Sequence, residues 1–202
     1  MKKFITLALA LCLALSASVF ASAAEVNSDG GSGSTPVYLS STEDGTLEGD
    51  PSATAMSVTV PTALPMAMSQ TGDVTTADNC QIINNSYGAV RVKSVNITTA
   101  NGWRLTSFGD KSTLASEKVD SNKLGFALSI GGGTQVMTDT SDESSQYLIS
   151  APIAGCYMSG SGNTSSNAVS VDYEAIVTPL SSAVTNANIA NVVFVIEWDT
   201  AA

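Results

Sequence analysis

Residues 169–178 read Val-Ser-Val-Asp-Tyr-Glu-Ala-Ile-Val-Thr, and residues 124–130 read Leu-Gly-Phe-Ala-Leu-Ser-Ile. In both stretches large apolar side chains alternate with small or polar ones. Because successive side chains of a β-strand point to opposite faces of its sheet, this period of two predicts strands with one buried and one solvated face. The two stretches therefore indicate antiparallel strands that cover a core on one side only.

Two further segments depart from this simple alternation. Residues 192–198 read Val-Val-Phe-Val-Ile-Glu-Trp and are apolar at nearly every position, which predicts a central strand covered on both sides. Near Ser94 the apolar positions change phase, and this predicts a bulge or a strand that bends from one sheet to the next. Val90 and Val92 lie in one phase of the alternation, whereas Val95 and Ile97 lie in the other.

Segments rich in Gly, Asn and Ser separate the predicted strands, and none of the remaining sequence has the pattern of an amphipathic helix. Residues 53–202 are therefore predicted to form one all-β domain. About 150 residues are enough to bury a proper core. We expect a single antiparallel β-sandwich, Ig-like or jelly-roll-like, with eight or nine strands.

The N-terminus has the three parts of a secretory signal peptide. Lys2 and Lys3 precede an apolar stretch at residues 4–15, and Ala21-Ser22-Ala23 supplies the small side chains of a cleavage site. Residues 1–23 are thus predicted to be a leader that directs secretion. No later run approaches the roughly 20 apolar residues of a membrane-spanning helix, so no membrane span is expected in the mature chain.

Residues 24–52 are predicted to be a flexible polar linker or tail. The segment at residues 28–34 consists of Ser, Asp and Gly, and the whole stretch has too few large apolar side chains to offset its own ordering entropy. One patch interrupts this polarity, namely Pro36-Val37-Tyr38-Leu39-Ser40. Residues 36–40 could add a short strand to a neighbouring molecule and so support self-association.

The charge balance limits the classes of partner. The chain has 8 basic and 18 acidic residues. Two of the basic residues lie in the predicted leader, so the mature chain has a net charge near −12. Nucleic acids and anionic membranes require basic surfaces and are not expected as partners. The chain also contains no histidine, which removes Ser-His-Asp catalysis, Cys-His catalysis and histidine-based zinc sites.

Two cysteines follow the predicted leader, Cys80 and Cys156. In an oxidising compartment an even pair of cysteines predicts a disulfide, and a loop of this length would stabilise the fold by about 4 kcal/mol in the chain-entropy model. The alternative is a pair of free, buried thiols.

The most specific local motif is Asn101-Gly102-Trp103-Arg104-Leu105. The Asn-Gly pair predicts a tight turn, after which Trp103 and Leu105 point to the same face of the next strand. Trp103 could fill the core of the sandwich, as tryptophans in such folds often do. Alternatively it could stand at a rim and stack on a sugar ring, together with Tyr87 from a neighbouring loop.

Trp103-Arg104-Leu105, with the upstream segment Val58-Thr59-Val60-Pro61, resembles the WxL-type domains of secreted and surface-associated Gram-positive proteins. The resemblance implies a β-rich fold and non-covalent attachment to the cell wall. It covers one of the two Trp-x-Leu motifs of that family, because the C-terminus reads Glu197-Trp198-Asp199 instead. The wider pattern over residues 56–199 is similar to small secreted proteins of gut-type Firmicutes, which carry no activity to transfer.

Two groups of acidic residues are candidates for catalytic or metal-binding roles. Asp139, Asp142 and Glu143 lie in a Ser/Thr-rich loop that could hold calcium, although the spacing is not that of an EF-hand and a solvated acidic loop is the simpler interpretation. Asp172 and Glu174 share one face of a strand, but that face is expected to meet water. We therefore expect no enzyme, no cofactor and no metal.

These observations predict a secreted, non-catalytic protein that binds a cell-wall polymer or a surface protein non-covalently. Two alternatives stay open. One is a structural subunit of an extracellular fibre or matrix that assembles by strand addition through residues 36–40. The other is a carbohydrate-binding module that uses Trp103 and Tyr87.

Overall fold

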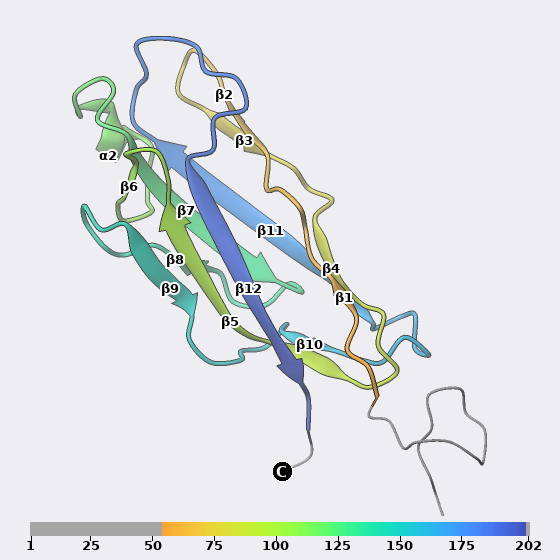
Figure 1. Cartoon of the computed structure of the whole chain (residues 1–202). Coiled ribbons are helices and arrows are strands. Elements are labelled where there is room, and N and C mark those ends of the chain that lie inside the picture. Colours follow the sequence, from red (N-terminus) through yellow and green to blue (C-terminus); the bar gives the residue numbers. More distant parts are fainter. Residues whose placement is uncertain (1–53, 201–202) are drawn as a thin grey trace, which may run out of the picture. The chain divides into compact units, whose positions relative to one another are not determined.

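The computed structural model describes residues 54–200. The predicted leader (1–23), the predicted linker (24–52) and the strand-adding segment (36–40) lie outside the described residues. Strands dominate the described part, with one short helix (Figure 1). The elements are β1 (Val58–Thr59), β2 (Met66–Met68), β3 (Val74–Thr76), β4 (Gln81–Asn84), β5 (Val90–Thr99), β6 (Arg104–Leu105), α2 (Ser112–Ala115), β7 (Lys123–Ile130), β8 (Val136–Met137), β9 (Ser145–Ile149), β10 (Tyr157–Met158), β11 (Ala168–Val177) and β12 (Ala190–Trp198).

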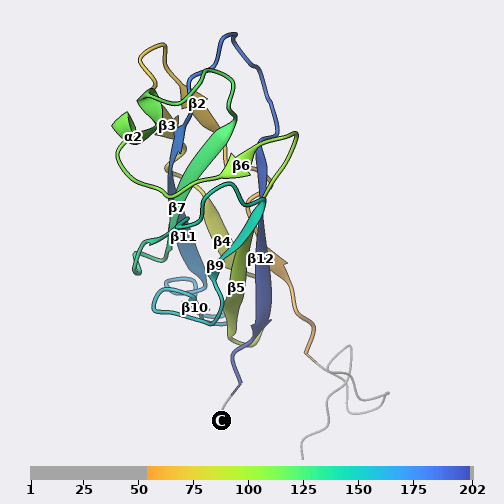
Figure 2. The ribbon, with the colours of Figure 1, turned by 90° about the vertical axis from the view of Figure 1, so that its left-hand side faces the viewer.

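Two sheets face each other across the core. The first has the strand order β1-β4-β11-β7-β6, with β8 also paired to β7, and the second has the order β10-β5-β12, with β9 also paired to β5. Strands β2 and β3 form a separate hairpin. Figure 2 shows β7 and β11 in one layer and β5, β9 and β12 in the other. The predicted all-β sandwich is confirmed, and the strands beyond the expected eight or nine are only two or three residues long.

Strands β7 and β11 form the antiparallel centre of the first sheet. Their register places Tyr173 opposite Leu128 and Ala175 opposite Phe126, and the rings of Phe126 and Tyr173 stack with centroids 6.0 Å apart. The predicted alternation holds from Val171 to Ala175, where Asp172 and Glu174 face solvent between buried neighbours, and it breaks at Ile176, which is buried as well. The apolar side chains of the two strands therefore supply much of the core.

The prediction of one solvated face is wrong for residues 124–130. Gly125 and Ala127 are buried as well as their apolar neighbours. The segment that follows β6 covers this second face, so a Cβ atom on Gly125 would meet the Phe108 backbone at 3.1 Å and the Ile176 side chain at 2.7 Å. Small residues here allow close packing of backbone on backbone, which alternation alone does not reveal.

Strand β5 is the central strand of the second sheet, and it contains the predicted bulge. Val90, Val92, Val95 and Ile97 are all fully buried, although the two pairs differ in phase. The register against β12 shifts between Val195 and Ile196, which pair with Ser94 and Val92. The extra residue, Lys93, lies on the β5 side, and the bulge returns both pairs of apolar residues to the core.

The expectation that residues 192–198 form a central strand is wrong. Within the described residues β12 pairs with β5 alone and ends the order of its sheet. Val193 and Val195 are 51 % and 42 % exposed, and the inward side chains of Val192 and Phe194 are only half-buried. The apolar residues on both faces of β12 therefore belong to an edge strand whose outer face is apolar, and not to a strand that is covered on both faces.

The predicted disulfide is not formed, because Cys80 and Cys156 are free thiols. Cys80 directly precedes β4 of the first sheet, whereas Cys156 directly precedes β10 of the second, and the two have different partners. The Cys80 carbonyl accepts a hydrogen bond from the Val171 amide of β11, whereas the Cys156 carbonyl accepts one from the Val92 amide of β5. Cys156 is fully buried, and this burial raises the pKa of its thiol. An even number of cysteines does not specify which positions of two sheets meet.

Candidate functional site

The structure does not bring the predicted binding residues together. Tyr87 lies in the connection that precedes β5 and is 86 % exposed, whereas Trp103 follows the other end of that ten-residue strand. A strand of that length spans about 30 Å. A single sugar ring therefore cannot contact both aromatic side chains.

Trp103 and Leu105 have packing roles. Asn101 and Gly102 both have positive φ, and the Trp103 amide donates to the Ala100 carbonyl across the predicted tight turn. Trp103 is half-buried against the core, and Leu105 is fully buried next to Leu124 in the parallel β6–β7 pair. Leu105 thus presents no surface to a ligand.

The acidic loop makes contacts within the protein. The Asp142 carboxylate lies 3.8 Å from the Lys123 ammonium, and the Asp142 carbonyl accepts a hydrogen bond from Arg104. The Glu143 carbonyl accepts one from the Leu105 amide. Within residues 54–200 no group of three or more acidic, cysteine or histidine side chains is placed to hold a metal ion. Likewise, none of the described helices is both long and apolar enough to cross a membrane.

A different surface gathers side chains suited to binding. The alternation of β5, β9, β10 and β12 sends one set of side chains into the core and the other to solvent, which we call the outer face. Exposed tyrosines stand on two of its strands, and hydroxyl, amide and charged groups lie between them. The outer face consists of Arg91, Lys93, Ser94, Asn96, Thr98, Ser145, Tyr147, Tyr157, Asn191, Val193, Val195 and Glu197.

One row crosses three strands of the outer face. Asn96 of β5 pairs with Tyr147 of β9 on one side and with Val193 of β12 on the other. Tyr147 is 65 % exposed. The Asn96 Oδ1 atom accepts hydrogen bonds from Thr98 and Ser145, at 3.0 and 3.1 Å, which fixes the orientation of the amide. Its Nδ2 group has no protein acceptor among residues 54–200 and can donate to a ligand.

A second row is formed by charged residues. Arg91 Nε lies 2.9 Å from Glu197 Oε1, Lys93 Nζ lies 3.0 Å from Glu197 Oε2, and Arg91 also contacts Asp199 at 3.3 Å. The hydrogen bonds from Lys93 and Arg91 lower the pKa of Glu197. Both cations of the outer face are thus held by carboxylates and are not free to bind an anion.

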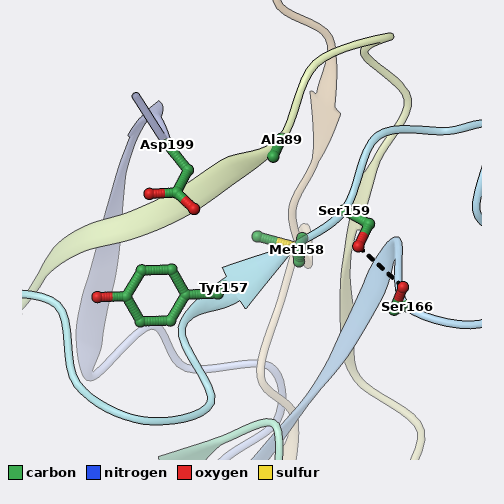
Figure 3. Close-up of a pocket in the computed structure, with 6 residues that line it drawn as sticks. All are labelled: Ala89, Tyr157, Met158, Ser159, Ser166 and Asp199. Atoms are coloured by element: carbon green, nitrogen blue, oxygen red, sulfur yellow. Dashed lines mark hydrogen bonds between the residues drawn. The ribbon is translucent and has the colours of Figure 1, made fainter. Parts of the chain in front are cut away.

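Tyr157 stands at the end of this charged row. It pairs with Arg91 in the β10–β5 ladder and borders a shallow depression of about 150 Å³. In Figure 3 the Tyr157 ring and the Asp199 carboxylate lie on one side of the depression, and the hydrogen-bonded hydroxyls of Ser159 and Ser166 lie on the other. Tyr157 therefore adds a second exposed aromatic ring, beside a small polar hollow.

The carboxylate of Glu197 predicts a pH effect on stability. Because its pKa is lowered in the folded protein, its contribution is fully present above the ordinary glutamate pKa near 4.5 and is lost as pH falls through the lowered value. We expect Glu197→Gln to lower the melting temperature at neutral pH, and the difference from wild type to vanish in acid. Glu174→Gln, which removes an exposed β11 carboxylate, is the matched control for melting curves from pH 2 to pH 8.

Tyr147 and Tyr157 were not predicted from the sequence. Each stands next to a residue that the structure buries, Leu148 or Met158, but in the sequence a tyrosine beside a large apolar residue is equally compatible with a core position until the phase of the strand is known. The alternation of β9 could have indicated it, because Ser145 and Tyr147 share one phase. What the sequence could not supply is the row itself, which needs the pairing of β9, β5 and β12.

Comparisons with known proteins offer no template for the outer face: no family model, curated protein or solved structure matches the chain. Its function is therefore inferred from the geometry described above.

Proposed function

We propose that this chain is a secreted, non-catalytic surface protein that binds a neutral polysaccharide of the bacterial cell wall on its outer face. The observation that carries the proposal is the row Tyr147–Asn96–Val193. An aromatic ring exposed on the face of a sheet offers an apolar surface for the C–H side of a sugar ring. The oriented Asn96 amide beside it supplies a donor for a sugar hydroxyl.

Charge favours a neutral polymer over an anionic one. The whole chain has a net charge of −10, so its field repels teichoic-type phosphates and other polyanions. Arg91 and Lys93, the cations of the outer face, are paired with Glu197. Binding is therefore expected to depend on ring stacking and hydrogen bonds, and to change little with salt concentration.

The same carboxylates argue for binding without hydrolysis. Glycoside hydrolysis requires a general acid with a raised pKa, paired with a second carboxylate across the glycosidic bond. On the outer face the pKa of Glu197 is shifted the other way, and its partner cations lie beside it. This supports a protein that holds a polymer and does not cut it.

Co-sedimentation with isolated Gram-positive cell walls, stripped of anionic polymers, tests the proposal. We expect the wild-type protein to pellet with the walls and Tyr147→Ala to weaken binding about tenfold, which corresponds to about 1.4 kcal/mol. Tyr87→Ala is the matched control, because Tyr87 is an exposed tyrosine beyond the end of the sheet.

Two outcomes would contradict this function. One is a wild-type protein that stays in the supernatant at every wall concentration. The other is equal binding by wild type and Tyr147→Ala, particularly if Tyr87→Ala binds less well, which would favour the loop before β5 over the outer face.

A further inference from the structure

The second sheet ends in a long edge whose backbone groups have no partner within residues 54–200. Among the described residues, strand β12 pairs only with β5 along its nine residues. The Val92 amide donates to Cys156, away from β12, and Val92 is opposite Ile196. In an antiparallel ladder such a pair exchanges no hydrogen bonds, so the N–H and C=O of Ile196 point to the open edge. The same follows at Ala190, because the amide of its partner Thr99 donates to Ser144.

The alternation between these two points fixes the rest of the edge. The backbone groups of Val192 and Phe194 also point away from β5, so β12 offers a regular series of donors and acceptors. The bulge does not interrupt this series, because the extra residue lies on β5. An added strand could therefore pair along the whole of β12.

The side chains of this edge are those that a protein usually avoids on an open strand. Proline and lysine commonly block edges, and β12 has neither. Its outward valines, Val193 and Val195, are about half exposed. The inward side chains of β12 are only half-buried, whereas the β5 valines and Ile97 opposite these inward side chains are fully buried. A further strand would cover apolar surface on both faces.

We propose that β12 pairs with β12 of a second copy of this chain, in antiparallel orientation about a two-fold axis at Phe194. In this register Phe194 is opposite its own copy, Val192 is opposite Ile196, and every opposed pair with outward backbone groups can exchange hydrogen bonds. Val193 of each copy lies opposite Val195 of the other. The two four-stranded sheets become one continuous sheet.

Charge is compatible with a second copy at this edge. Glu197 is the only charged residue of β12 and its carboxylate is held by Arg91 and Lys93. In the two-fold register it is opposite Asn191, so no like charges meet. The edge is thus nearly neutral, although the protein as a whole is acidic. Because salt screens the repulsion between the net negative charges of the two copies, we expect tighter association at higher salt.

The dimer has a consequence for the outer face. Joined at β12, two outer faces form one continuous surface, so a polymer bound as proposed above would meet two rows of Tyr147 and Asn96. The dimer itself does not depend on that function. Because a single pair of edges buries less than a standard interface, we expect a weak dimer that dissociates on dilution.

Sedimentation equilibrium of the purified mature chain, residues 24–202, over a range of concentrations, tests the register directly. We expect Val193→Lys and Val195→Glu each to raise the dimer dissociation constant about tenfold, because each places a charge opposite a valine at two symmetric positions. The double variant Val193→Lys/Val195→Glu places opposite charges face to face and is expected to return most of the affinity, whereas Val193→Lys/Val195→Lys is not. Val184→Lys is the matched control, since Val184 is an exposed valine of the loop before β12.

Three results would overturn the proposal. The first is a protein that stays monomeric up to about 1 mM, which corresponds to an association weaker than about 4 kcal/mol. The second is a dimer that the single variants leave unchanged, or a double variant that is weaker than either single variant. The third is a dimer that Leu39→Asp dissociates, which would assign the edge to residues 36–40 and not to a second β12.

Discussion

Replacing Gly155 with alanine is expected to destabilise the protein more than any other single-methyl change described here. Gly155 has φ of +91°, and a Cβ atom built on it would lie 2.0 Å from the Ile130 carbonyl oxygen. The neighbouring atom is backbone at the end of β7, so it cannot move aside as a flexible side chain could. Left-handed strain and overpacking together should cost about 3 to 5 kcal/mol.

The packing around Gly155 explains why the effect should be large. A Cβ on Gly131 would lie 2.6 Å from the Gly155 carbonyl oxygen, and one on Gly133 would lie 2.2 Å from the Ala154 carbonyl oxygen. The turn after β7 thus docks directly on the turn before β10. Because β10 carries Tyr157, Gly155→Ala should also disturb the hollow at the end of the outer face.

Urea unfolding of the variant measures this destabilisation. Gly162→Ala is the control, because a Cβ there has no atom within 4 Å and the backbone does not have positive φ. We expect the control to match wild type within about 0.5 kcal/mol. A midpoint for Gly155→Ala equal to that of Gly162→Ala would show that the two turns are not packed as described.

Asn84→Asp is the second change with a large expected effect. Asn84 is fully buried, its Nδ2 donates to the carbonyls of Gly88 and Ser159 at 2.9 and 2.8 Å, and its Oδ1 accepts from the Ser86 amide at 2.9 Å. Aspartate keeps the shape but replaces both donors with a carboxylate oxygen that faces two carbonyls. Leaving these buried groups unpaired and burying a charge should cost about 3 to 5 kcal/mol at neutral pH.

The pH dependence of the Asn84→Asp variant separates charge from packing. A protonated aspartate regains one donor and loses the buried charge, so the deficit relative to wild type should shrink as the pH is lowered. Asn85→Asp is the matched control, because Asn85 is exposed and its side chain donates one hydrogen bond, to the Thr59 hydroxyl. Melting temperatures that decrease equally in both variants would contradict a special role for Asn84.

Both sites hold the connections that carry the exposed aromatic residues. Asn84 links the β4–β5 loop, which bears Tyr87, to the strand end after Tyr157 through Ser159. Gly155 fixes the turn before the same strand. A loss of wall binding in these variants should therefore accompany a loss of stability, whereas Tyr147→Ala should affect binding alone.

Local alternation in the sequence determined which residues of a strand lie on the same face of the sheet. Along β11 the period of two places Val171 and Tyr173 in the core and Asp172 and Glu174 in solvent, as predicted. The change of phase near Ser94 predicted the β5 bulge correctly. Both predictions are local, because the side-chain direction follows from the pleat of one strand and needs no knowledge of its neighbours.

Only the tertiary structure decided which strands lie beside one another. The apolar run at 192–198 is equally compatible with a central strand and with an edge strand whose outward valines are exposed. The structure decides between them, because within residues 54–200 β12 pairs with β5 alone. For the same reason the number of cysteines could not show whether Cys80 and Cys156 form a disulfide. The row of the outer face could not be predicted either. In chain order Asn96, Tyr147 and Val193 follow one another at intervals of about 50 residues, and long-range pairing alone makes them neighbours.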